Sequence, residues 1–125
     1  MKTLLALAII ILIGLTAQKC NEKKSAGSVY KAKLEIKALC MNYTIRLLEG
    51  NLDTSKITGT WTDETTGKSY TNVFGLANPC DFPSSINQGD EFFFSIDTAK
   101  VQNCAVCMAY YPTPPKKLTI KIATK

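Results

Sequence analysis

The sequence has 125 residues and no histidine. This absence excludes a Ser-His-Asp or Cys-His nucleophile system, and it excludes His-ligated zinc and haem attachment through C-x-x-C-H. It also removes the side chain that most often serves as a general base near neutral pH. The acidic residues fall mostly in expected turns, and no spacing pairs two carboxylates as a glycosidase would. We therefore expect no catalytic residues, no bound metal and no cofactor.

Long hydrophobic runs are also scarce. Residues 4–15 form one run without a polar side chain, but a helix that crosses a bilayer needs about 20 apolar residues. Lys2 precedes the run and small residues follow it, which is typical of a secretory signal peptide. We expect a signal peptide over residues 1–17 with cleavage after Ala17. The mature protein is then exported to the periplasm, the cell surface or the extracellular space.

Cys20 leaves a second form of export open. A bacterial lipoprotein signal places the lipidated cysteine directly after the apolar run and usually puts a small residue before it. Gln18 and Lys19 stand before Cys20 in this sequence, so the pattern departs from that motif. Cys20 is a candidate lipidation site or a free thiol. We expect membrane contact only if Cys20 is lipidated, in which case the protein is a membrane-anchored lipoprotein.

The remaining chain has almost no helical pattern. Residues 18–28 are polar and small and predict a flexible leader, followed by one domain over 29–125. Apolar and polar residues alternate along 30–38, and the alternation changes phase at Leu39-Cys40-Met41 before it continues to residue 47. This phase change indicates either one bulged, sharply bent strand or a close pair of strands. Further strands are expected at residues 57–62, 69–74, 91–96 and 117–123.

This count gives five strands and an all-β fold, which we expect to be a small five-stranded antiparallel OB-like barrel. Residues 33–122 resemble small exported bacterial proteins that have an OB-like β-barrel and no assigned activity. The shared features are Cys40-Met41 in the first strand, Gly89-Asp90-Glu91-Phe92 before the fourth strand, and Cys104 before the last strand. The resemblance implies the fold and the export, and it implies no pairing of Cys80 or Cys107, which lie outside it.

The cysteines carry the main chemistry of the sequence. Exported proteins meet an oxidising compartment, so the default state of Cys40, Cys80, Cys104 and Cys107 is disulfide-bonded. Chain entropy favours long-range pairs, in which Cys40 bonds to Cys104 or Cys107 and Cys80 bonds to the other. The alternative is a local disulfide between Cys104 and Cys107.

The C-x-x-C spacing of Cys104 and Cys107 has two functional interpretations. It is found in thiol redox proteins, although there it lies at a helix N-terminus in a βαβ context that this sequence lacks. Sulfur ligands from Cys104, Cys107, Met108, Cys40 and Met41 would suit copper(I), and the four cysteines would suit zinc. A thiol redox or soft-metal-handling protein using the Cys104-Cys107 pair is therefore the alternative function.

Aromatic residues next to prolines suggest a contact surface. Tyr110, Tyr111 and Pro112 form a stiff loop segment, and Trp61 is a further candidate. Exposed aromatic residues on a rigid loop suit contacts with a glycan or with a protein. The formal net charge of +5 is modest, and export makes nucleic acid an unsuitable partner. We expect a monomeric, disulfide-stabilised module with a binding or structural role and a protein or glycan ligand.

Overall fold

The structure is a computed structural model that describes residues 27–98 and 104–124. These residues form seven β-strands, and their only helical segments are three single 3-10 turns. The strands are β1 (Tyr30–Lys37), β2 (Tyr43–Glu49), β3 (Thr58–Thr62), β4 (Ser69–Leu76), β5 (Glu91–Ile96), β6 (Lys117–Leu118) and β7 (Ile120–Ala123). The turns are η1 (Leu39–Met41), η2 (Thr54–Lys56) and η3 (Pro79–Asp81). The predicted all-β fold is confirmed, whereas the expected signal peptide and Cys20 lie outside the described residues.

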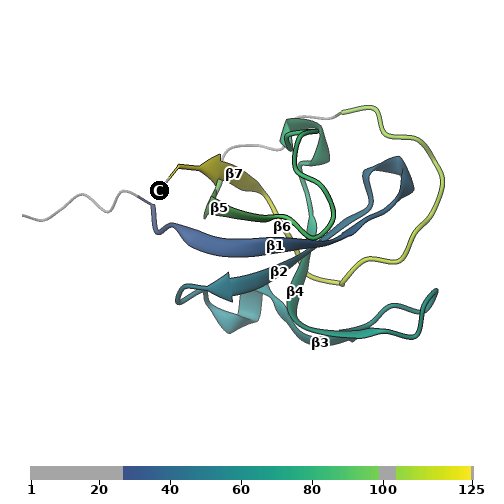
Figure 1. Cartoon of the computed structure of the whole chain (residues 1–125), viewed down its shortest axis with the longest axis horizontal. Coiled ribbons are helices and arrows are strands. Elements are labelled where there is room, and N and C mark those ends of the chain that lie inside the picture. The colour runs from purple at the N-terminus through teal and green to yellow at the C-terminus, as the bar shows by residue number, and fades with distance from the viewer. Residues whose placement is uncertain (1–26, 99–103, 125) are drawn as a thin grey trace, which may run out of the picture.

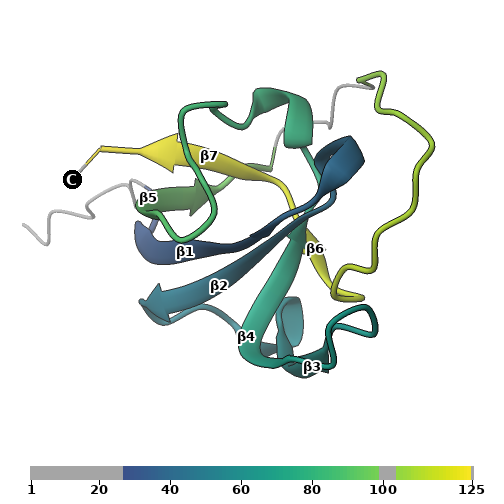
Figure 2. The ribbon, with the colours of Figure 1, turned by 45° about the vertical axis from the view of Figure 1, so that its right-hand side comes forward.

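The strands form one sheet in the order β3-β4-β2-β1-β5-β7, and every neighbouring pair in this order is antiparallel (Figures 1 and 2). β6 lies off this path and pairs in parallel with the end of β4, through only two residue pairs. These two pairs leave the sheet short of a closed barrel. The expected all-β, largely antiparallel architecture is confirmed, but the expected complete barrel of five strands is not found. Two expected strands are each divided in two, which raises the strand count.

The expected bent first strand is a hairpin of β1 and β2, which was the second of the two options. Cys40 and Met41 turn the chain with φ values of 57° and 58°, a conformation that L residues other than Asn and Asp seldom adopt. The β1–β2 pairing also has two register shifts, but they lie earlier, between Lys31 and Ala32 and between Leu34 and Ile36. The expected last strand is interrupted at Thr119, because its first half pairs with β4 and its second half with β5.

The concave side of the sheet holds the main hydrophobic core. Phe74, Phe94, Leu34 and Ile45 are fully buried there. Phe94 lies 5.6 Å from Phe74 and 5.3 Å from Tyr30 between ring centroids. A second, smaller cluster of Ile36, Tyr70 and Val73 forms near the β3–β4 hairpin, with Trp61 and Tyr111 packed against it.

Candidate contact surface at the disulfide-clamped tip

Two disulfides join distant segments of the chain. Cys40 bonds to Cys107, and Cys80 bonds to Cys104, with Cα–Cα distances of 5.0 Å and 6.0 Å. Both are long-range, as the chain-entropy argument predicts, and the local Cys104–Cys107 bond is absent. The disulfides indicate an oxidising compartment outside the cytoplasm.

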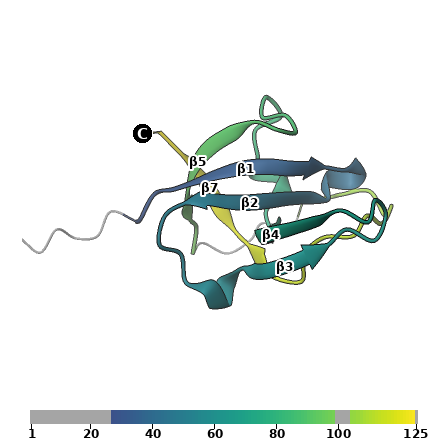
Figure 3. The same ribbon diagram turned by 60° about the horizontal axis from the view of Figure 1, so that its bottom comes forward.

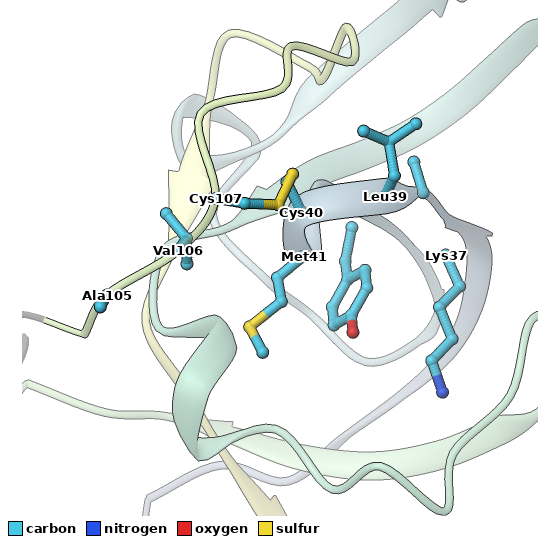
Figure 4. A pocket seen from close by; sticks show the side chains of 9 residues that line it. Lys37, Leu39, Cys40, Met41, Ala105, Val106 and Cys107 are labelled. Atoms are coloured by element: carbon cyan, nitrogen blue, oxygen red, sulfur yellow. A yellow bond between two sulfur atoms is a disulfide. The ribbon is translucent and has the colours of Figure 1, made fainter.

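The Cys40–Cys107 bond attaches the long loop before β6 to the turn between β1 and β2. Cys40 is the middle residue of that turn, and Cys107 lies in the loop segment that the structure describes from residue 104 onward. Asn42 strengthens the attachment, because its side-chain amide donates to the carbonyl oxygens of Leu39 at 3.0 Å and Ala109 at 3.2 Å. The turn and the loop therefore form one cross-linked unit (Figure 4).

This unit exposes large apolar side chains. Leu39 is 56% exposed, Met41 40%, Val106 44%, Met108 99% and Tyr110 81%. In the described part of the chain, the only other large hydrophobic residue with comparable exposure lies at the start of β1. Isolated exposed apolar residues are ordinary on protein surfaces, but a group on two cross-linked segments is a candidate interaction site. We call these five residues the clamped tip.

A shallow hollow of about 510 Å³ lies at the clamped tip. Leu39, Met41, Tyr43 and Val106 line it together with the Cys40–Cys107 disulfide, as Figure 4 shows for its labelled side chains. Lys37 stands at its edge, where its ammonium group donates to the carbonyl oxygens of Ser84 at 3.1 Å and Ile86 at 2.7 Å. The lining is therefore aliphatic, aromatic and sulfur-containing, and its one cation is held by backbone oxygens.

The aromatic residues suggested by the sequence do not form one surface. Tyr110 is exposed, but Tyr111 is half-buried and Pro112 is buried. Trp61 is half-buried and stacks on Tyr70, with ring centroids 6.0 Å apart. Tyr111 and Pro112 therefore anchor the loop to the domain, and only Tyr110 belongs to the clamped tip.

Tyr111 anchors the loop through a buried carboxylate. Its hydroxyl donates to Oδ2 of Asp63 at 2.7 Å, and Asp63 is 1% exposed. The other carboxylate oxygen accepts the backbone N–H of Thr65 at 2.8 Å. Burial raises the pKa of Asp63, but the hydrogen bonds from Tyr111, Thr65 and Thr66 outweigh burial and hold it below the ordinary value. The same hydrogen bond to Asp63, followed by burial, raises the pKa of Tyr111.

Replacing Tyr111 by phenylalanine is expected to lower the melting temperature at neutral pH by about 5 °C, because a buried carboxylate loses a donor. The ionised Asp63 stabilises the fold above its ordinary pKa of 3.8, and this contribution is lost as the pH falls through the lower folded-state pKa. The protonated Tyr111 stabilises the fold below its ordinary pKa of 10.0, and this contribution is lost as the pH rises through the higher folded-state pKa.

Thermal unfolding over a pH series measures both effects. Tyr111→Phe removes the alkaline loss and reduces the acid loss, so its stability profile is flatter than that of the native protein at both ends. Tyr110→Phe is the matched control, because the neighbouring side chain is 81% exposed and its replacement leaves the profile unchanged. Equal effects of the two substitutions would show that the bond to Asp63 does not anchor the loop.

The redox and metal-site interpretations need Cys104 and Cys107 to be free or bonded to each other, and the structure does not provide this geometry. Cys104 and Cys107 are each bonded to a different cysteine, so they form neither a dithiol nor a disulfide with each other. Within residues 27–98 and 104–124, no three Cys, Asp or Glu side chains gather in a way that would hold a metal ion.

As contact residues, sequence reasoning missed four of the five residues of the clamped tip, and it considered Met41 and Met108 only as sulfur ligands. Hairpin turns usually contain Gly, Asn or Asp, whereas this turn has Leu39 and Met41 on either side of a cysteine. Val106 and Met108 flank Cys107 in the same way. Apolar residues on both sides of two cysteines in turns and loops were the available signal, because nothing in a turn buries them.

Comparisons with known proteins add no relative. No family model matches the chain, and neither a curated protein nor a solved structure matches it. In the described residues, no helix has the length and apolar character needed to cross a membrane. The geometry of the clamped tip is therefore the basis for a functional assignment.

Proposed function

We propose that the chain is an exported binding protein that contacts a partner protein through the clamped tip. The observation that carries this proposal is the gathering of exposed apolar side chains on two segments that the Cys40–Cys107 disulfide joins. Binding surfaces gain most of their affinity from a few central side chains that lose water on contact. Leu39, Met41 and Val106 around the hollow are the side chains suited to this role.

The chemistry of the surface favours a protein over a glycan. Glycan sites need planar aromatic faces together with polar groups that hydrogen-bond to sugar hydroxyls. The clamped tip offers one exposed tyrosine, and its other four side chains are aliphatic or thioether groups. Methionine adapts its shape to a partner's apolar surface because it is unbranched and polarizable. An apolar protein surface is therefore the ligand that fits.

The cross-links also support a binding role. Ordering a loop during association costs free energy, and a loop that is already fixed avoids that cost. The loop before β6 is held by Cys107, by the amide of Asn42 at Ala109, and by Tyr111 at Asp63. These attachments fix the part of the loop that carries Val106, Met108 and Tyr110 before any partner arrives.

The clamped tip lies at the end of the molecule opposite to the beginning of β1. β1 has eight residues, and an extended strand of this length spans roughly 26 Å. Figures 1 and 2 show the beginning of β1 at one end of the molecule and the turn after β1 at the opposite end. If the chain is attached through residues that precede β1, the clamped tip points away from the attachment.

Site-specific photo-crosslinking in the cells that export the protein tests this proposal. A photoreactive residue in place of Met108, which is 99% exposed, is expected to give an adduct of one discrete mass. The same residue in place of the exposed Asn51, which follows β2 at the other end of the hairpin, is the control and gives none. Adding Met41→Asp and Val106→Asp is expected to abolish the adduct at position 108.

Three results would contradict the proposal. The first is the absence of an adduct at position 108, and the second is the same adduct from positions 51 and 108. The third is an adduct that persists when both aspartates are present. Circular dichroism and the unfolding midpoint of each variant establish that the fold is intact, since Met41 and Val106 are exposed and their replacement leaves the core unchanged.

A further inference from the structure

β3 forms one end of the sheet order and is an edge strand. It pairs with β4 on one side, and no described strand pairs with its other side (Figure 3). The unpaired N–H and C=O groups of an edge are a template for another strand, and proteins usually guard them with charges, prolines or bulges. β3 has the sequence TGTWT, with no charge and no proline, and its pairing with β4 shows no register shift.

The opposite end of the sheet is different. β7 carries Lys121, which is exposed in the middle of its four residues. A lysine at this position discourages the addition of another strand. The unguarded character of β3 is therefore specific to one edge of this sheet.

We propose that β3 pairs with β3 of a second copy of the chain, antiparallel and two-fold symmetric about Thr60. The two copies then share one continuous sheet. The proposal goes beyond the contact surface at the clamped tip, because β3 contributes none of its five residues. It also differs from the monomer that the sequence led us to expect.

Charge selects the register. Lys56 ends the turn η2 before β3, and Glu64 lies in the turn after β3. Pairing about Thr60 therefore brings Lys56 of one copy near Glu64 of the other, and symmetry repeats this approach at the other end of the strand. Both residues are exposed, and neither forms a salt bridge to any residue in the described part of the chain. Opposite charges across an antiparallel pair stabilise it, and like charges destabilise it.

Side-chain size fits the same register. Gly59 of one copy lies opposite Trp61 of the other, so a large ring covers the position that has no side chain. A cross-strand aromatic residue is a known way to stabilise a glycine at a sheet edge. Nothing lies within 4 Å of the position that a Cβ of Gly59 would occupy, which leaves this space open to the partner's ring. Thr58 then faces Thr62, a pair that suits β-strands.

Other registers lose these pairings. An antiparallel pair centred on Trp61 places Glu64 opposite Thr58 and leaves Lys56 opposite an uncharged threonine. A pair centred on Gly59 places Lys56 opposite Thr62. A parallel, in-register pair places Lys56 beside Lys56 and Glu64 beside Glu64, which is repulsive. Of these arrangements, the one about Thr60 is the one that brings the exposed Lys56 and Glu64 together.

The geometry also sets the size and the strength of the assembly. A two-fold pair uses the same surface on both copies, and it leaves neither β3 edge free to pair with a third copy. Assembly therefore stops at the dimer. A strand of five residues buries much less surface than the roughly 1,600 Å² of a typical stable interface. We therefore expect a weak dimer that forms as the concentration rises from micromolar to millimolar.

Sedimentation velocity of the mature protein across this concentration range tests the proposal. The native protein is expected to change from monomer to dimer. Lys56→Glu and Glu64→Lys are each expected to raise the dissociation constant about tenfold, because two attractive pairs per dimer become repulsive. The double substitution exchanges the charges and is expected to restore the native dissociation constant. Lys121→Glu is the matched control, because it changes the net charge by the same amount at the other edge and leaves the dimer unchanged.

A separate variant places a charge on the symmetry axis. Thr60 is exposed, so Thr60→Lys keeps the fold, but it brings two lysines together at the centre of the dimer and is expected to leave only monomer. The proposal is wrong if the native protein stays monomeric up to millimolar concentration. It is also wrong if the dimer survives Thr60→Lys, or if the charge exchange fails to restore the association that the single substitutions weaken.

Discussion

Replacing Cys40 and Cys107 together by alanine is expected to lower the free energy of unfolding by about 4 kcal/mol. The disulfide joins residues 67 positions apart, and a cross-link over such a loop removes much of the conformational entropy of the unfolded chain. A domain of this size has a total stability of about 5–15 kcal/mol. The loss therefore amounts to a large part of the stability of the domain.

The second disulfide is expected to contribute less. Cys80 and Cys104 are 24 positions apart, and the chain-entropy model assigns this loop about 3.5 kcal/mol. Their loop lies inside the loop closed by Cys40 and Cys107, so each bond shortens the free chain that the other constrains. Each single loss is measured while the other bond still constrains the chain, so the loss from removing both is larger than the sum of the two single losses.

Urea unfolding of the two double-alanine variants measures these contributions. The Cys40→Ala/Cys107→Ala variant is expected to have the lower midpoint. It is also expected to lose the photo-adduct at position 108 under conditions in which it stays folded, because the loop is no longer fixed to the turn. The Cys80→Ala/Cys104→Ala variant is the matched control, since it also lacks one bond but keeps the Cys40–Cys107 connection. If the Cys40→Ala/Cys107→Ala variant kept the adduct, the Cys40–Cys107 disulfide would not be required for binding.

Local sequence patterns predicted the strands closely. The expected segments at 57–62, 69–74 and 91–96 match β3, β4 and β5 to within two residues at each end. Gly50, directly after β2, shows a local requirement. Its φ of 119° and the Tyr30 ring 2.5 Å from where a Cβ would lie both require glycine. Alternation and turn chemistry are local properties, so a single sequence reveals them.

The closure of the sheet was not predictable in the same way. Whether β6 and β7 complete a barrel depends on how many residues pair with β4 on one side and with β5 on the other. The structure shows two pairs with β4 and four with β5. These numbers follow from the three-dimensional curvature of the sheet, and the alternating pattern of residues 117–123 is the same for either outcome.

The candidate site was predictable only in part. The pairing of cysteines over long distances followed from entropy, but the choice between Cys104 and Cys107 as the partner of Cys40 depends on the path of the loop. Tyr111 and Pro112 looked like surface residues because the loop has many prolines. Their burial depends on Asp63, which lies 48 positions away in another hairpin, and no local pattern shows this contact.

The second prediction with a large effect on stability concerns Phe94 in the hydrophobic core. Phe94→Ala is expected to lower the free energy of unfolding by about 4 kcal/mol, because the removed ring leaves a cavity as well as losing its own burial. Phe94 is 0% exposed, and its ring contacts those of Tyr30, Phe74 and Phe92 at centroid distances between 5.3 and 6.3 Å. These rings come from three strands, so the cavity lies where β1, β4 and β5 meet.

The neighbouring phenylalanine makes a matched control. A run of three phenylalanines is typical of a strand covered on both faces, but the two faces of β5 differ. Phe92 and Phe94 point into the core, whereas Phe93 points to the opposite face and is half-buried. Phe93→Ala is therefore expected to cost less than half as much as Phe94→Ala in the same urea experiment. Phe94→Leu, which keeps most of the volume, is expected to cost about 1.5 kcal/mol. Equal losses at positions 93 and 94 would mean that both faces of β5 are equally covered, which would contradict the difference in burial between Phe93 and Phe94.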